Sequence, residues 1–277
     1  MAIRLQLRLF FWHAFLYVLT VGTGIAAAYE YGLKQAGSGV VEPVEPSWQT
    51  GLIFLLVFVS FSLFLARSHR FSQSLLKILM VAVIFYGASV SLGVFMSSPL
   101  NTVVAVLIIA AYLFWPRVFV HDIAIILGIA GISALLGLSL TPTAALIILS
   151  VLSIYDIIAV YRTGHMIRMA QSMMESGAIF GFLVPLKLSG FLSLRKQAQD
   201  TRDFIILGSG DVSLPLIFAC SLVTVSLQSA IVTSVFTLAG LFVTHLLFVN
   251  QEGRHPMAAL PPIATATILG YLVSLSL

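Results

Sequence analysis

Two aspartates lie within long apolar stretches of the sequence. Asp156 follows Tyr155, and Asp211 follows the short run Gly208-Ser209-Gly210. An ionised carboxylate in an apolar medium is costly unless something compensates for it. If two such carboxylates lie close together, both cannot ionise cheaply, so one holds a proton and the other does not. Aspartic proteases use this state: the ionised partner takes a proton from water while the protonated partner polarises the scissile carbonyl.

The composition indicates that these aspartates lie in a membrane. Of the 277 residues, 60% are hydrophobic and only 9% are charged, whereas soluble domains carry about 25% charged residues. We therefore expect an integral membrane protein surrounded by lipid. The net charge of +4 does not indicate a nucleic-acid partner, because the basic residues are scattered among apolar stretches. The single cysteine, Cys220, excludes an intramolecular disulfide and a CxxC metal or redox site.

The apolar stretches predict an all-α membrane protein with nine transmembrane helices. A helix needs about 20 apolar residues to cross the hydrocarbon layer. The expected spans are 9–28, 49–66, 75–96, 100–116, 119–140, 142–162, 204–226, 229–249 and 256–277.

The distribution of lysine and arginine predicts the orientation of these spans. With the N-terminus in the cytoplasm, every Lys and Arg except Lys34 falls on the cytoplasmic side. The C-terminus is then extracellular. The expected location is the cell membrane, crossed several times.

The spans divide the chain into three parts. Residues 1–162 form an N-terminal six-helix bundle, 163–203 a cytoplasmic loop, and 204–277 a C-terminal three-helix part. Within the loop, methionines recur at helical spacing over 166–174, which predicts an amphipathic helix on the membrane surface. The apolar segment 177–194 contains a proline, a lysine and several glycines, so we expect a re-entrant or interfacial segment and not a tenth span.

Charge positions place the two aspartates at similar depth. Asp156 lies six residues before Arg162, or ~9 Å at helical rise, and Asp211 lies eight residues after Asp203, or ~12 Å. Because consecutive antiparallel helices are commonly neighbours, the two carboxylates could face each other below the cytoplasmic surface. The same reasoning brings Leu260, in the last span, to a similar depth.

Residues beside the aspartates suit a protein substrate. Gly208 and Gly210 remove side chains next to Asp211, so an extended substrate backbone could approach closely. Tyr155 offers a hydroxyl and a ring beside Asp156.

This chemistry requires no metal and no cofactor, and the absence of an HExxH motif argues against a zinc protease.

Three short motifs accompany this arrangement: YD at 155–156, GSGD at 208–211 and ALP at 259–261. They resemble the motifs of presenilins and signal peptide peptidases, the GxGD intramembrane aspartyl proteases, and the resemblance covers the whole nine-span layout. The sequence YDIIAVYRTGHMIRM and the cytoplasmic N-terminus look more like the presenilin branch. The short connection before residue 204 looks more like a microbial relative than an animal presenilin.

The resemblance implies roles for individual residues. It implies that Asp156 and Asp211 are the catalytic pair, and that the substrates are proteins with transmembrane helices. It also implies that Ala259, Leu260 and Pro261 shape the site and contact substrate. Two positions depart from the family's usual pattern and bear on substrate fit. Ala258 stands where the third motif usually has proline, and Ser209 stands where GxGD usually has leucine.

A substrate helix would have to unwind locally before cleavage, because its own hydrogen bonds shield a helical amide. The freed strand could pair with an exposed backbone edge near 258–261 or within 177–205. Pro261 and Pro262 are expected to keep their segment from forming a regular helix.

Other interpretations of the same residues are open. A proton-coupled transporter or cation leak would use Asp156 and Asp211 as carriers, but would need polar residues along a whole pathway. A prepilin-peptidase-like GxGD protease would usually carry lysine at the position of Ser213. A rhomboid-like site would pair Ser89, in the sequence GASV, with His245, although small residues are common at helix contacts. We expect His13 and His245 to form hydrogen bonds between helices.

Overall fold

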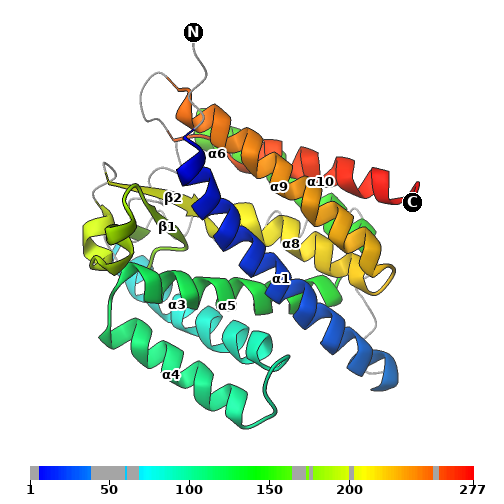
Figure 1. The fold of residues 1–277 in the computed structure, drawn as a ribbon, viewed down its shortest axis with the longest axis horizontal. Helices are drawn as coiled ribbons and strands as arrows, with labels where there is room; N and C mark the ends of the chain where they lie inside the picture. The colour runs from blue at the N-terminus through cyan, green and yellow to red at the C-terminus, as the bar shows by residue number, and fades with distance from the viewer. Residues whose placement is uncertain are drawn as a thin grey trace.

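The chain is seen in a computed structural model, which describes residues 6–38, 60, 69–163, 173–174, 177–199, 203–251 and 256–277. This part of the chain is mostly helical (Figure 1). Its helices are α1 (Leu7–Ser38), α3 (His69–Leu92), α4 (Leu100–Phe114), α5 (Val118–Leu138), α6 (Pro142–Tyr161), α8 (Ser209–Val223), α9 (Leu227–Val249) and α10 (Leu260–Ser274). Two strands, β1 (Gly181–Pro185) and β2 (Phe204–Gly208), and two 3₁₀ helices, η1 (Leu188–Leu192) and η2 (Arg195–Gln199), lie between α6 and α8.

The helices have the lengths and composition of a membrane protein. Within the described residues, 5 helical segments are long and apolar enough to cross a membrane, namely Leu7–Lys34, Ser74–Leu92, Val118–Leu138, Pro142–Tyr161 and Leu227–Val249. The helices α4, α8 and α10 are apolar but shorter. Apart from residue 60, the predicted span 49–66 lies outside the described residues, as does most of the methionine-rich segment 166–174. The total of nine spans therefore stays a prediction.

Helix α5 lies at the centre of the bundle. It packs against α1, α3, α4 and α8, and its N-terminal half also contacts β1 (Figure 1). Helix α3 can come close to α5 because Gly87 faces the backbones of Gly128 and Gly131, where a Cβ atom would have no room. The GASV sequence that begins at Gly87 therefore belongs to a helix contact, as the small-residue interpretation predicted.

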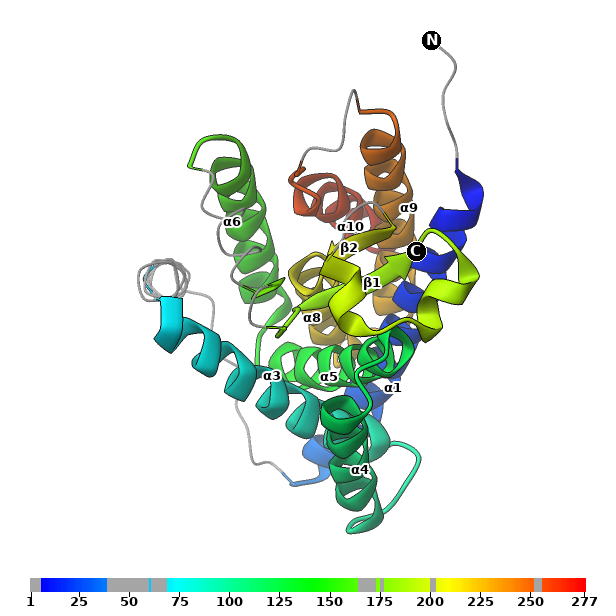
Figure 2. The ribbon, with the colours of Figure 1, turned by 90° about the vertical axis from the view of Figure 1, so that its left-hand side faces the viewer.

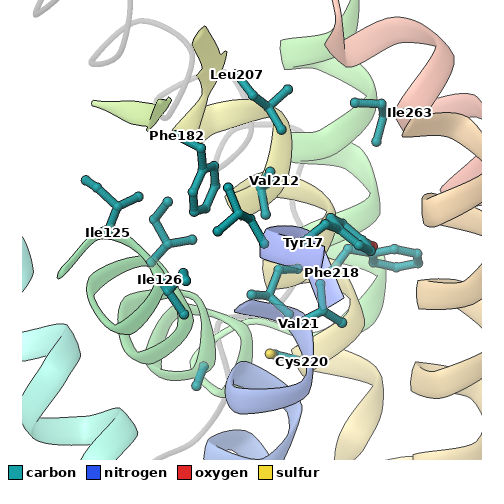
Figure 3. Packing of buried hydrophobic residues seen from close by; sticks show 14 of the residues in the cluster. Tyr17, Val21, Ile125, Ile126, Phe182, Leu207, Val212, Phe218, Cys220 and Ile263 are labelled. Atoms are coloured by element: carbon teal, nitrogen blue, oxygen red, sulfur yellow. The ribbon is translucent and has the colours of Figure 1, made fainter. Parts of the chain in front are cut away.

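The apolar core joins the sheet to three helices. Phe182 of β1, Phe218 of α8 and Ile125 of α5 are buried in one cluster (Figure 3). Cys220 is fully buried in the same cluster, and its Sγ lies 3.6 Å from the carbonyl oxygen of Gly24 in α1. This packing holds α8 against α5 and α1.

Helices α6, α9 and α10 lie on the opposite side of α8 from α3 and α4, in the upper part of Figure 2. Helices α9 and α10 pack closely, and the hydroxyl oxygens of Thr237 and Thr267 lie 2.9 Å apart at their contact. Helix α6 packs against both α8 and α10. The three predicted motifs therefore lie on mutually contacting helices.

The antiparallel sheet corrects two predictions. β1 pairs with β2 so that Gly181 is opposite Gly208 and Pro185 is opposite Phe204. The fold is mostly helical, as predicted, but it includes a two-stranded sheet that the all-α prediction lacked, and the helix predicted over 204–226 begins only at Ser209. The segment 177–194 does not form a tenth helix, as expected, but contributes β1 and a 3₁₀ helix.

The start of the last helix corrects a third prediction. Helix α10 begins at Leu260, not at residue 256, and Pro261 and Pro262 lie inside its first turn. The expectation that these prolines prevent a regular helix is wrong. Proline is tolerated in the first turn of a helix, where its missing N–H would have no intrahelical partner.

Candidate active site

Asp211 lies in the first turn of α8, directly after the sheet. The strand β2 ends at Gly208, which is the N-cap residue of α8. The backbone N–H of Gly208 donates a hydrogen bond to the Asp211 carboxylate, which is half of a capping box. Asp211 is only 8% exposed. The strand-to-helix transition therefore holds this buried carboxylate in place.

Asp156 lies in α6 and contacts the start of α10. Its side chain is 5% exposed, and its Oδ2 atom accepts a hydrogen bond from the backbone N–H of Leu260 at 3.3 Å. Leu260 is the first residue of α10. Because Pro261 and Pro262 have no N–H, few donors are available in this first turn, and one of them is directed at Asp156.

The structure brings the two aspartates together. Helix α6 packs against α8, and the carboxylates of Asp156 and Asp211 are close enough to interact electrostatically. Each carboxylate also lies at the N-terminus of a helix, α8 for Asp211 and α10 for Asp156. The positive ends of both helix dipoles therefore favour negative charge at the pair. A buried pair of acids that carries one negative charge and one proton can supply both a base and an acid.

The two glycines of the GSGD motif have different surroundings. A Cβ atom at Gly208 would lie 2.9 Å from Oδ2 of Asp211, whereas a Cβ atom at Gly210 would meet nothing within 4 Å. Gly210 is exposed. Gly208 thus makes room for the carboxylate, and Gly210 leaves space beside it.

The other predicted site residues lie around the pair. Ser209 donates its backbone N–H to the carbonyl of Phe180 at 3.1 Å, which extends the pairing of the strands by one residue. Tyr155 precedes Asp156 on α6 and is half-buried. The carbonyl of Ala259 accepts the hydroxyl of Thr244 at 3.5 Å, which ties the ALP segment to α9.

The two histidines predicted to bond between helices lie next to each other at the contact of α1 and α9. The ring centroids of His13 in α1 and His245 in α9 are 5.8 Å apart. Nδ1 of His13 makes its hydrogen bond within its own helix, to the carbonyl of Leu9 at 2.8 Å. Ser89 lies on α3, and its hydroxyl donates to the carbonyl of Phe85 at 2.8 Å. These contacts do not form a serine–histidine pair.

Ser89→Ala is expected to leave proteolytic activity unchanged, because the Ser89 hydroxyl bonds to the carbonyl of Phe85 in its own helix. The measurement is the initial rate of cleavage of a transmembrane substrate by the purified variant, with Asp211→Asn as the inactive control. Loss of cleavage by well-folded Ser89→Ala protein would support a serine mechanism instead.

Sequence reasoning missed one buried pair of polar residues. Because Arg117 lies only five residues before Asp122, the sequence predicts this aspartate near the end of a span and not in the protein interior. In the structure Asp122 is 2% exposed and its neighbour His121 is 1% exposed. Both contact β1. The sequence does carry a signal for this buried pair, namely a histidine next to an aspartate at the start of an apolar stretch. Among the described residues, no three His, Cys, Asp or Glu side chains are grouped to hold a metal ion.

Comparisons with known proteins point to one family. A family profile described as "Signal-peptide peptidase, presenilin aspartyl protease" matches residues 33–277. Two solved structures of a presenilin family intramembrane aspartate protease are similar over 94% of this chain. The structure in space group C222 is 25% identical, with a TM-score of 0.60 over 94% of that chain. The structure in P2 is 28% identical, with a TM-score of 0.61 over 96% of that chain.

A search of curated proteins gave no match. The family profile extends over most of the chain and includes all three motifs, and the similar structures share its fold. The chain therefore belongs to the signal-peptide peptidase and presenilin family and is an intramembrane aspartyl protease.

Proposed function

We propose that the protein hydrolyses peptide bonds within the transmembrane helices of substrate proteins, using Asp156 and Asp211 with a water molecule. The observation that carries this proposal is the pairing of two buried carboxylates at the N-termini of α8 and α10. In this mechanism the ionised aspartate removes a proton from water, and the protonated one donates a hydrogen bond to the scissile carbonyl. The activated water attacks the carbonyl carbon to form a tetrahedral intermediate, the proton taken from water passes to the leaving nitrogen, and the C–N bond breaks to release an amine and a carboxylic acid.

The unwound substrate strand is proposed to add to the outer edge of β2. At the two ends of the paired strands, the backbone N–H of Leu186 donates to the carbonyl of Asp203 and that of Ser209 donates to the carbonyl of Phe180. These two opposite pairs are therefore hydrogen-bonded pairs, which fixes the residues in between that point towards the partner strand. Since inward and outward residues alternate in an antiparallel pair, the backbone groups of Phe204 and Ile206 point away from β1. The N–H of Gly208 points the same way but is already bonded to Asp211. Within the described residues, β2 has a strand on one side only. A substrate strand on the other side would run towards Asp211.

We propose that water reaches the aspartates from the cytoplasm and that the protein crosses the cell membrane nine times. Two observations support this: the lysines and arginines lie almost entirely on one side of the predicted spans, and both aspartates lie near the ends of α6 and α8 that this distribution places inside. The undescribed segment 49–66 would provide the remaining span.

The decisive test is mass spectrometry of the products that purified wild-type protein forms from a transmembrane substrate in lipid vesicles. We expect two fragments cut within the hydrocarbon-spanning sequence, and we expect a hydroxyl-containing aspartyl transition-state mimic to block their formation. Proton or cation flux without any peptide product would overturn the proposal in favour of a transporter.

A further inference from the structure

Two adjacent side chains of α5 form hydrogen bonds to the backbone of β1. Nε2 of His121 donates to the carbonyl oxygen of Gly181 at 2.9 Å. The backbone N–H of Leu183 donates to Oδ1 of Asp122 at 2.9 Å. Both side chains are almost completely buried. Hydrogen bonds made in such surroundings are costly to lose, because the groups left behind find no water.

These bonds occupy the outer edge of β1. The outward residues of this strand are Gly181, Leu183 and Pro185, opposite Gly208, Ile206 and Phe204 of β2. His121 takes the carbonyl of Gly181, Asp122 takes the N–H of Leu183, and Pro185 has no N–H to offer. An edge strand whose groups are covered in this way cannot readily accept another strand. The side chains of His121 and Asp122 thus close one edge of the sheet and leave β2 as the edge that can pair.

The same bonds fix the position of the strand that leads to the catalytic aspartate. β1 is held on α5, β2 is paired with β1, and β2 ends at Gly208, whose N–H bonds to Asp211. The connection between the strands is also fixed at the start of α5, where the backbone N–H of Val118 donates to Ser193 at 3.1 Å. That contact holds the loop, whereas His121 and Asp122 act within the strand itself.

Each of the two side chains uses a single polar atom for this contact. Nδ1 of His121 and Oδ2 of Asp122 are buried and have no hydrogen-bond partner in the described part of the chain. The contact to β1 therefore needs one donor from His121 and one acceptor from Asp122, and it does not need an acidic group.

We propose that His121 and Asp122 are positioning residues of the protease: they set the register of the sheet against α5 and thereby determine which substrate bond reaches Asp156 and Asp211. This inference rests on the proposed function. It assigns to the pair a role in the choice of cleavage site and no direct part in the chemical step.

The test compares variants that keep or remove the single contact of each side chain. Asp122→Asn keeps the acceptor and Asp122→Ala removes it, while His121→Gln keeps a donor near the position of Nε2 and His121→Leu removes it. The measurement is the distribution of cleavage positions, by mass spectrometry, together with KM and kcat for the purified, folded variants.

We expect Asp122→Asn and His121→Gln to cut at the wild-type bond. Asp122→Ala and His121→Leu should cut at several neighbouring bonds, and their KM should rise roughly tenfold, because a buried backbone group loses its partner and the sheet loses its register. A purely structural role would lower the yield of folded protein without moving the cleavage position.

Two results would overturn the inference while leaving the protease intact. One is an unchanged cleavage position and KM in folded Asp122→Ala and His121→Leu. The other is loss of all cleavage in folded Asp122→Asn, which would make Asp122 a participant in proton transfer. Failure of the proposed function itself would look different, because wild-type protein would then give no intramembrane products.

Discussion

Replacing either Asp156 or Asp211 with asparagine is expected to lower the rate of substrate cleavage by roughly 10³-fold or more. Asparagine matches the size of aspartate but can neither take a proton from water nor donate an acidic proton to the scissile carbonyl. Each variant should lose activity alone, because acid and base act together in one step. The measurement is product formation from a transmembrane substrate in vesicles, with a sensitivity that resolves the residual rate.

The folded state of these variants needs a separate check, since Asp156 also accepts the N–H of Leu260 and Asp211 accepts that of Gly208. Asparagine can still accept both bonds, so thermal unfolding should change little. The matched control is Asp122→Asn, the same substitution at another buried aspartate of the bundle. Cleavage at the wild-type rate by Asp156→Asn or Asp211→Asn would refute the assignment of the pair.

Gly208→Ala is expected to reduce kcat by roughly 10²-fold, while Gly210→Ala should leave kcat within a few-fold of wild type. The added methyl group at Gly208 would lie 2.9 Å from Oδ2 of Asp211 and displace the carboxylate, whereas at Gly210 it meets nothing within 4 Å. Small displacements of a reacting group are costly because the reaction depends on close alignment. The measurement is kcat and KM for both variants with the same substrate.

Because Gly210 is exposed beside the carboxylates, an added methyl group there would meet the substrate rather than the protein. We therefore expect Gly210→Ala to act through a higher KM. Equal losses of kcat in the two variants would contradict the different surroundings of the two glycines, and unchanged kcat in Gly208→Ala would show that the carboxylate tolerates displacement.

The proposed catalytic pair could be predicted from the sequence because burying an acidic residue in an apolar environment is costly. Acidic residues are rare in apolar stretches because burying them is expensive, so Asp156 and Asp211 were conspicuous. Their distances from flanking charges placed them at one depth, and the structure brings them together. The start of the last helix was also expected near this depth, and Leu260 contacts Asp156.

The strands could not be predicted in the same way. The residues FIIL at 204–207 are continuously apolar, and a short run of this kind fits a buried strand as well as a helix segment. Only its pairing with the distant segment 181–185 makes it a strand. The prolines after Leu260 were misjudged because their effect depends on whether they fall inside a helix or in its first turn. The role of Asp122 depends on its hydrogen bond to β1, so it could not be predicted without knowing that this strand exists.

The burial of Cys220 has a practical consequence for following this enzyme at work. The chain has no other thiol, and this one is fully enclosed between α8 and α1. Maleimide dyes and nitroxide spin labels should therefore leave the native protein unmodified. A cysteine introduced on the exposed face of α6, and another on α9, would then accept probes selectively, so that changes in their separation during turnover could be recorded without first removing the natural residue.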